Sequence, residues 1–473
     1  MDKEKKLLLK NSLVFSIAPF LPKIVNILLL PVMTKYLTAT DFGISATISA
    51  YSQAIGAFSL LGFGVVLQNT YFKYSEKYKE IWRQIYGFLN LWLIFYAIVQ
   101  AVILFFFIPE EAQENKWLII LLTNFSTIFF GATGTIGNYY YVYSKQSLPI
   151  VWRSVLASVS TIVVNFILIV YLKMGYLGWY IGSFVGTFIS NATYWYVVNK
   201  KLEIKPNYYF DWNIIKHALK VGVPTIPHYY SNYMLEGAGR MVMDRIHIPQ
   251  SEIGRVGISQ QISDLFNQGM TGLNNAISPY AMTALKQNNS KKVVQILYIF
   301  IAIVFSLAFT ISIWSKEILF ILLSNESLFS AYPYLILYIM AFCYRPLYLI
   351  ASYYFMYYEK TGKLLLVSTM SGFIAIVLYI LLIPKYGAWG FLIGHYVACL
   401  YYGYSGYTFN VFKENAEFRP PIIIIMSLQV FLTVLAYYLV DYIWTKSLLT
   451  IIILLLIVLI LLCKKKDIIS FLR

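Results

Sequence analysis

Long apolar stretches alternate with short polar connections along the whole chain. A helix that spans a membrane needs about 20 mostly apolar residues. The apolar runs do not alternate residue by residue, as the strands of a membrane barrel would, so we interpret them as helices. Cutting the chain at charged clusters and at Pro and Gly turns predicts fourteen spanning helices, near residues 12–36, 42–68, 84–108, 117–142, 150–172, 177–198, 218–240, 254–279, 294–314, 333–356, 364–383, 389–409, 421–440 and 448–463.

The composition excludes the soluble classes of protein. Of the 473 residues, 59% are hydrophobic and only 12% are charged, whereas a soluble domain is roughly 45–50% apolar and about 25% charged. The three cysteines lie in apolar stretches and do not form a disulfide framework. The sequence therefore predicts an all-α polytopic membrane protein.

The basic residues predict how the chain crosses the membrane. Connections that follow even-numbered helices, together with the two tails, hold 26 of the 37 Lys and Arg residues, and the opposite connections hold nine. Because basic residues concentrate in cytoplasmic loops, we expect both termini in the cytoplasm. This distribution also explains the net charge of +16 without a nucleic-acid partner.

Two pairs of segments indicate an internal repeat. The stretch 175–182 is similar to 387–394 at an offset of 212, and 41–43 is similar to 252–254 at an offset of 211. The first six helices and the next six are therefore predicted to be two copies. Because six is even, both copies cross the membrane in the same sense, which predicts a parallel repeat. The expected divisions are a six-helix lobe over 1–200, a second over 201–412, and helices 13 and 14 with a basic tail over 413–473.

Polar side chains recur at helical spacing in several of the predicted helices. In helix 8, Gln260, Asp264 and Asn267 follow one another at steps of four and three, which places them on one face. A single stripe is consistent with hydrogen bonds between helices, but stripes in equivalent helices of both copies favour a shared wet cavity. We expect the following uncharged or weakly basic residues to line it: Gln53, Asn124, His228, Asn232, Gln260, Asn267 and His395. The two histidines also fit ordinary interior positions.

Charged residues within the predicted helices are the strongest functional signal. Lys23 and Arg345 lie midway along their helices, and Arg240 follows the polar stripe of helix 7. A buried charge in a membrane is costly and marks a functional site, although Lys23 could pair with an acid, Arg345 could cap carbonyls at the Pro346 kink, and Arg240 could reach the membrane surface. Taken as cavity residues, the three would bind an anionic, phosphate-bearing amphiphile.

The acidic residues and the missing motifs complete the prediction. Glu236 and Asp264 are candidates to bind a coupling Na+ or H+. We find no metal-ligand spacing, nucleophile motif or nucleotide-binding loop in the sequence. The sequence therefore predicts a transporter rather than an enzyme, with no cofactor and no metal.

Several short motifs resemble those of one known superfamily. They are residues 35–43 (KYLTATDFG), 223–228 (VPTIPH), 243–245 (MDR) and 386–390 (YGAWG). With the duplicated six-helix pattern and two extra helices, they resemble the polysaccharide-transporter branch of the multidrug/oligosaccharidyl-lipid/polysaccharide (MOP) exporter superfamily. The resemblance implies a MATE-like fold and a flippase for undecaprenyl-pyrophosphate-linked oligosaccharide of O-antigen, capsule or exopolysaccharide, in the bacterial cytoplasmic membrane.

The resemblance also implies roles and partners. Lys23, Arg345 and Arg240 would hold the pyrophosphate, and the uncharged cavity residues would contact sugar. The implied partners are the lipid-linked oligosaccharide, membrane lipids, a polysaccharide polymerase and a chain-length regulator. Two alternatives remain open at this point: a cation-coupled multidrug exporter of the same fold, and a flippase for a peptidoglycan lipid precursor.

Overall fold

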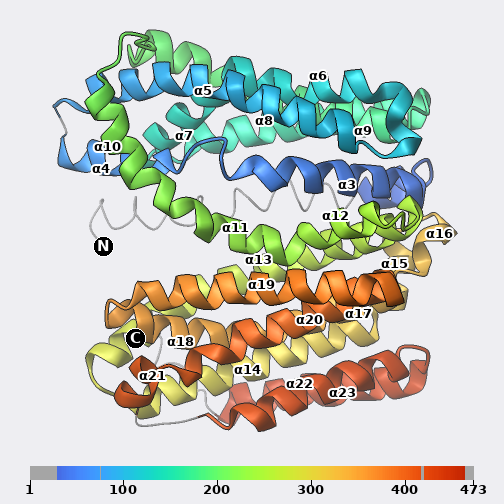
Figure 1. The fold of residues 1–473 in the computed structure, drawn as a ribbon. Coiled ribbons are helices and arrows are strands. Elements are labelled where there is room, and N and C mark those ends of the chain that lie inside the picture. The colour runs from blue at the N-terminus through green and yellow to red at the C-terminus, as the bar shows by residue number, and fades with distance from the viewer. Residues whose placement is uncertain (1–28, 75, 417–419, 464–473) are drawn as a thin grey trace. The chain divides into compact units, whose positions relative to one another are not determined.

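A computed structural model describes residues 29–74, 76–416 and 420–463, and these residues form helices and no strand. The predicted all-α fold is therefore confirmed (Figure 1). The α-helices are α3 (Ala39–Gly56), α4 (Phe63–Lys73), α5 (Tyr78–Phe107), α6 (Lys116–Ser126), α7 (Ala132–Tyr143), α8 (Leu148–Asn165), α9 (Tyr176–Tyr196), α10 (Trp212–Gly222), α11 (Ile226–Glu236), α12 (Ala238–Arg245), α13 (Gln250–Lys286), α14 (Ser290–Ile313), α15 (Ser315–Leu322), α16 (Glu326–Phe329), α17 (Tyr332–Ala341), α18 (Arg345–Tyr357), α19 (Thr361–Tyr386), α20 (Ala388–Tyr404), α21 (Asn410–Asn415), α22 (Ile422–Leu439) and α23 (Ile443–Cys463).

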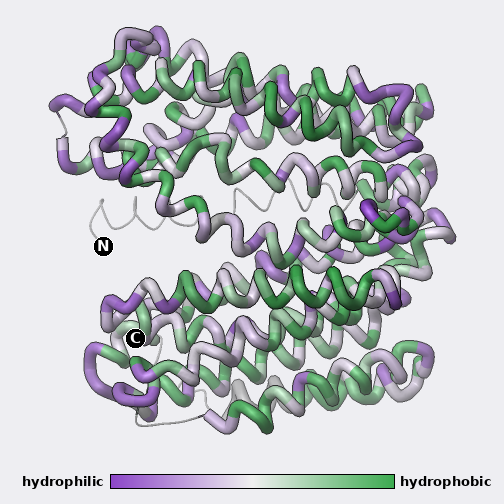
Figure 2. Tube along the Cα trace, viewed as in Figure 1, coloured by the Kyte–Doolittle hydropathy of each residue, from purple (hydrophilic) through white to green (hydrophobic). Residues whose placement is uncertain are grey.

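Apolar length identifies the chain as a multi-pass membrane protein. Within the described ranges, seven helical segments are long and apolar enough to cross a membrane. Figure 2 shows hydrophobic residues along α19, α22 and α23, and hydrophilic residues at the turn between α4 and α5. Helices α11 and α13 are not among the seven: α11 has only 11 residues, and the many polar residues of α13 lower its hydropathy.

Three of the predicted helices are interrupted. Helix 2 is divided into α3 and α4, helix 7 into α10, α11 and α12, and helix 10 into α17 and α18. Pro224 lies in a 3-10 turn at the first interruption of helix 7, and Pro346 follows the 3-10 turn of helix 10. Proline has no N–H to donate to the preceding turn, which accounts for the interruption of helices 7 and 10.

The chain folds into two compact units. The first comprises Met1–Ile258, Leu322–Leu328 and Ser368–His395, and the second comprises Ser259–Ile321, Phe329–Val367 and Tyr396–Arg473. We describe each unit separately below and call them unit 1 and unit 2. The predicted lobe boundaries at residues 200 and 412 stay a prediction.

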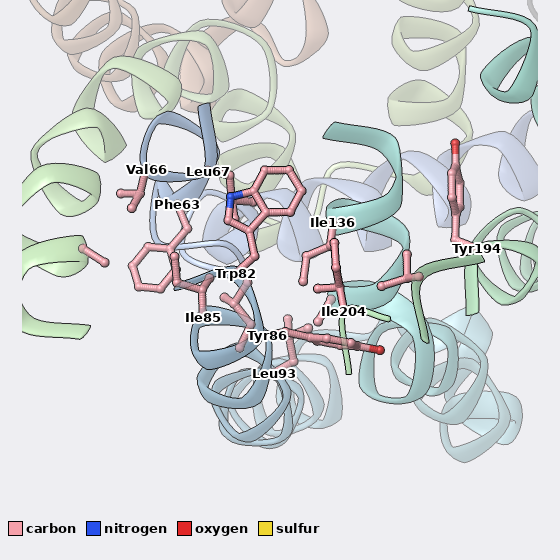
Figure 3. Packing of buried hydrophobic residues seen from close by; sticks show 14 of the residues in the cluster. Phe63, Val66, Leu67, Trp82, Ile85, Tyr86, Leu93, Ile136, Tyr194 and Ile204 are labelled. Atoms are coloured by element: carbon pink, nitrogen blue, oxygen red, sulfur yellow. The ribbon is translucent and has the colours of Figure 1, made fainter. Parts of the chain in front are cut away.

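The core of unit 1 is built on aromatic and branched side chains. Figure 3 shows the Trp82 ring close to Leu67 of α4, with Ile85 and Tyr86 further along α5. Trp82 is fully buried, and its indole Nε1 donates a hydrogen bond of 2.8 Å to the Thr70 hydroxyl. The one polar atom of this large ring is thus satisfied, as burial requires.

Helix α9 packs closely against α8 through small residues. A side-chain carbon at Gly182 would overlap the Asn165 Oδ1 atom, and one at Gly186 would overlap the Thr161 hydroxyl. Gly178 meets Leu168 and Ile169 in the same way. These three glycines, spaced four residues apart, thus allow the close helix packing that small residues favour in membrane proteins.

Substituting Gly182 with Ala should destabilise the protein moderately. The added methyl overlaps the end of the Asn165 side chain, which can rotate away. We expect a loss of about 1 kcal/mol in the free energy of unfolding, measured by denaturation in detergent. Gly269→Ala is the matched control, because nothing lies within 4 Å of a methyl there. Equal stability of the two variants would contradict the packing argument.

The structure preserves the repeat at both of its anchor points. Helices α3 and α13 begin at Ala39 and Gln250, 211 residues apart. Gly175 and Gly387 directly precede α9 and α20, and both have left-handed backbones, with φ of 53° and 57°. Glycine adopts this conformation without strain, so each copy uses glycine for the positive φ directly before the equivalent helix.

The two copies meet within unit 1 through a reciprocal crossing of α3 and α13. A side-chain carbon at Gly43 would overlap the carbonyl oxygen of Gln250, and one at Gly254 would overlap the carbonyl oxygen of Ala39. Since Ala39 is equivalent to Gln250, and Gly43 to Gly254, each copy offers the other the same surface. This is the pattern of a two-fold related contact.

Polar bonds surround this crossing. The Thr47 hydroxyl donates to Gln250 Oε1 at 2.9 Å, and Gln250 Nε2 donates to Asp244 Oδ1 at 2.8 Å. The other oxygen of Asp244 accepts from the Tyr51 hydroxyl at 2.6 Å. The carboxylate therefore joins α3, α12 and α13 by hydrogen bonds of known direction.

Ion pairs join the last two helices to α15 within unit 2. The Lys446 ammonium is buried, donates to the Val440 carbonyl at 2.7 Å and pairs with Glu317 at 2.5 Å. A second pair joins Lys316 to Asp441 at 2.6 Å, and its hydrogen bond raises the pKa of Lys316. Lys316 and Glu317 both belong to the short helix α15, so the two ion pairs join α15 to the start of α23 and to the turn before it.

Candidate functional site

The site in unit 1 begins at the interruption of helix 2. Helix α3 ends at Gly56 and α4 begins at Phe63, and the intervening turn includes left-handed backbones at Leu61 and Gly62, with φ of 48° and 69°. The Ser59 hydroxyl donates to the Gly56 carbonyl at 2.7 Å and stabilises the turn. A side chain at Gly62 would overlap the Gly222 carbonyl oxygen, so glycine is required there.

The second copy does not repeat this interruption. Helix α13 is continuous from Gln250 to Lys286, and Asn267 occupies the position equivalent to Gly56. The break is therefore a feature of the first copy alone. In membrane transporters, interrupted helices expose backbone groups where a cavity is lined.

A cavity of about 390 Å³ lies at this break. Its size is near the lower end of the range typical of small-molecule sites. The polar side chains of α3 and α11 that line it are Gln53, Asn232 and Glu236, and two rings, Tyr139 and Tyr233, complete the wall. The full lining is Gln53, Gly56, Ala57, Ser59, Leu60, Gly62, Gly64, Tyr139, Asn232, Tyr233 and Glu236.

Three of the predicted site residues thus meet in one cavity. Gln53 comes from helix 2, whereas Asn232 and Glu236 come from helix 7, one turn apart. Gln53 and Asn232 are exposed, and Glu236 is half-buried. Sugar contact by the amides and ion binding by the carboxylate stay predictions.

The tyrosines of the cavity were missed by sequence reasoning. Tyr139 follows Asn138 in the polar stripe of helix 4, and Tyr233 follows Asn232. In a chain with 42 tyrosines, a tyrosine carries little information by itself. Its position next to a stripe residue is the signal that would have selected these two.

Among the lining residues, there is one carboxylate and no lysine or arginine. The sequence predicted a net cationic cavity from Lys23, Arg240 and Arg345. Lys23 lies outside the described residues, as does the side chain of His228. The electrostatics of this part of the site are therefore acidic and amide-rich.

Arg240 lies next to the cavity residues but is turned into the protein. It is 7% exposed, and its guanidinium donates to the backbone carbonyls of Glu236 at 3.3 Å and Ala46 at 3.5 Å. These bonds connect α12 to α3. The predicted contact of Arg240 with phosphate remains a hypothesis that would require this side chain to turn.

The other unit 1 candidates are also interior. His395 is 3% exposed, and its Nδ1 lies 3.1 Å from the Leu235 carbonyl. Asn124 is 6% exposed, donates to the Ile120 carbonyl, and precedes a π-helical turn over Thr127–Gly131. Neither residue lines the described cavity.

Unit 2 brings two further candidates together. The Arg345 guanidinium donates to Asn267 Oδ1 at 2.7 Å, so helices 8 and 10 place a cation and an amide side by side. The Tyr348 and Tyr402 rings pack against each other in a tilted arrangement, with centroids 4.3 Å apart. Gln260 and Asp264 lie on the same helix as Asn267, with Gln260 buried and Asp264 half-buried.

The part of the chain that the structure describes contains no cluster of metal-binding side chains. No group of three or more His, Cys, Asp or Glu side chains there could hold a metal ion. The two sites instead consist of amides, phenols, one carboxylate and one guanidinium. Such groups bind and orient a polar ligand by hydrogen bonds and charge.

The fold defines the class of the protein: a multi-pass helical membrane protein whose fold is that of MOP superfamily transporters. Its structure is similar to that of "Lipid II flippase MurJ, inward closed conformation", with a TM-score of 0.66 and 17% identity, covering 92% of this chain and 100% of that chain. It is also similar to an inward-facing multidrug resistance MATE family transporter of the MOP superfamily, with a TM-score of 0.61 and 15% identity, covering 84% and 97%. A third similar structure is a MOP superfamily transporter from Pyrococcus furiosus (TM-score 0.54, 16% identity, covering 85% and 95%).

The family follows from the sequence itself. The model of the family "Polysaccharide biosynthesis protein" matches residues 8–267, more than half of the chain. The chain therefore belongs to the polysaccharide biosynthesis protein family. No curated protein sequence matches it. The resemblance predicted from the short motifs is confirmed by this family match and by the similarity of fold.

Proposed function

We propose that the protein is a flippase that moves undecaprenyl-pyrophosphate-linked oligosaccharide across the bacterial cytoplasmic membrane by alternating access. The main observation that supports this proposal is the cavity lined by amides and tyrosines at the break of helix 2. The chain also belongs to a polysaccharide biosynthesis family. Amides and phenols both donate and accept hydrogen bonds, which matches the hydroxyl groups of a sugar. Similarity to a lipid II flippase supports a lipid-linked substrate.

In this proposal, the sugar and the pyrophosphate are recognised by different residues. Gln53 and Asn232 contact sugar hydroxyls in unit 1, and Arg345 with Asn267 holds phosphate in unit 2. Lys23 and Arg240 add positive charge, and the polyprenyl chain stays in the lipid. Glu236 and Asp264 bind the coupling Na+ or H+. Both termini are cytoplasmic, and the product is passed to a polymerase and its chain-length regulator.

Removing the amides of the cavity should slow translocation of the head group. Each lost hydrogen bond to an uncharged partner is worth about 1 kcal/mol, so Gln53→Leu and Asn232→Leu should each lower the rate roughly fivefold. The measurement is translocation of a fluorescent lipid-linked oligosaccharide in vesicles that contain the purified protein. Asn90→Leu, an amide of α5 outside the cavity lining, is the matched control. Unchanged rates in both cavity variants would refute the sugar-binding role.

The carboxylate of the cavity favours one alternative, a cation-coupled multidrug exporter. Glu236 would attract a lipophilic cation. Two variants, Asn232→Leu and Glu236→Gln, distinguish the exporter from the flippase when they are tested in cells. Loss of resistance to cationic drugs with Glu236→Gln, and normal translocation of lipid-linked oligosaccharide, would favour the exporter.

A further inference from the structure

The first helix outside the repeat carries a buried polar ladder. Gln429 of α22 is fully buried, its Nε2 donates to the Met340 carbonyl at 2.9 Å, and its Oε1 accepts from the Tyr404 hydroxyl at 2.8 Å. One turn further, the Thr433 hydroxyl donates to the Gln429 carbonyl and lies 2.7 Å from the Tyr396 hydroxyl. A buried amide is costly unless it is bonded, so both ends of this side chain have defined partners and a fixed direction.

The acceptor of this amide lies at the interruption of helix 10. Met340 is in the last turn of α17, directly before the 3-10 turn over Phe342–Tyr344. In that turn the Arg345 N–H bonds to the Phe342 carbonyl, three residues back, and Pro346 has no N–H to contribute. Carbonyls at such a break lose regular helical donors. Gln429 supplies a donor from another helix.

Arg345 is the first residue of α18 after the break. Its guanidinium donates to Asn267 at 2.7 Å, and the direction in which it leaves the backbone depends on how the break is held. We propose that Gln429 is a positioning residue: through the Met340 carbonyl it holds the bend of helix 10 that directs Arg345 to Asn267. The use of Arg345 for phosphate rests on the proposed function, but the positioning itself does not. Helix α22, outside the duplication, thereby gains a role in the site.

The position of the Arg345 guanidinium can be measured without any substrate, through its effect on the local electrostatic potential. In the full chain with Tyr348→Cys, one turn after Arg345, the thiol is modified with an anionic and a cationic methanethiosulfonate reagent, and wild-type labelling is subtracted as background. A positive charge one turn away should favour the anionic reagent, and Arg345→Gln should lower the anion-to-cation rate ratio roughly tenfold. We expect Gln429→Met to lower the ratio at least about threefold.

Controls separate positioning from general stability. Thr433→Val removes the neighbouring hydrogen bonds, which go to Tyr396 and to the Gln429 backbone and not to helix 10, so the ratio should stay within about twofold of the parent. If Gln429→Met does not accumulate, Tyr404→Phe keeps the amide but removes the hydroxyl that orients it, and should lower the ratio in the same direction. A parental ratio in the folded Gln429 or Tyr404 variant overturns the proposal. Because no substrate is used, this outcome is independent of whether the protein moves lipid-linked oligosaccharide.

Discussion

Substitution of Gly254 with Ala should lower the free energy of unfolding by about 1–3 kcal/mol, and Gly254→Leu should prevent accumulation of folded protein. The added carbon overlaps the Ala39 carbonyl oxygen and lies 2.8 Å from the Gly43 backbone nitrogen. Both are backbone atoms in the first turns of α3, which cannot rotate away as a side chain can. Relief therefore requires α3 and α13 to separate.

The effect should be shared by the equivalent position. Gly43→Ala overlaps the Gln250 carbonyl, so its cost should match that of Gly254→Ala. Gly257→Ala, which meets the Ala46 side chain at 3.1 Å, should cost less. Gly269→Ala on α13 is again the matched control. The measurement is denaturation of the purified protein in detergent, with the monodisperse fraction after extraction as a second readout. A double variant whose loss equals the sum of the two single losses would contradict a shared contact.

The crossing also shows what a sequence repeat can predict. The offset of 211 identified residues 41–43 and 252–254 as equivalent, and the structure places these segments against each other within unit 1. Equivalence does not specify contact, because related segments can also lie on opposite sides of a pseudo-two-fold axis. Glycine at both positions was the available hint, since small residues allow close approach of helices.

Helix interruptions were harder to predict than helices. Hydropathy averages over about 20 residues, so a six-residue turn between Gly56 and Phe63 does not divide the predicted helix 42–68. The turn depends on glycine at position 62 packing against the Gly222 carbonyl, a contact between distant parts of the chain. The cavity at this break was therefore predicted through Gln53 and Asn232, but not its position.

Periodicity also could not distinguish a lining residue from an interior one. The stripe of helix 7 predicted Asn232 and Glu236, which line the cavity, and the same helical face was extended to Arg240, which bonds to backbone carbonyls instead. Gly237, which separates α11 from α12, keeps a helical backbone, with φ of −93° and ψ of −42°, so the chain continues helically to Arg240. Spacing predicts which face of a helix is polar, but it does not predict whether a long side chain on that face lines a cavity or bonds to backbone carbonyls.

Arg345→Ala should reduce translocation of lipid-linked oligosaccharide roughly 10- to 100-fold, the largest effect on transport that we expect. A hydrogen bond to a charged group contributes about 1.5–3 kcal/mol. The variant would lose the contact with phosphate and would also leave the Asn267 amide without its Arg345 partner. Arg345→Lys keeps the charge but loses the planar fork of donors, so it should retain an intermediate rate.

The measurement is head-group translocation in vesicles at matched protein density, with thermal unfolding to verify the fold. Arg255→Ala removes a guanidinium that pairs with Glu252 instead, and it should transport at the wild-type rate. Lys23→Ala tests the second predicted cation in the same assay. Wild-type rates for Arg345→Ala and Lys23→Ala together would exclude both from phosphate binding. A loss with Arg345→Ala that Arg345→Lys does not relieve at all would instead favour a structural role at the Pro346 bend, because charge alone would then not matter.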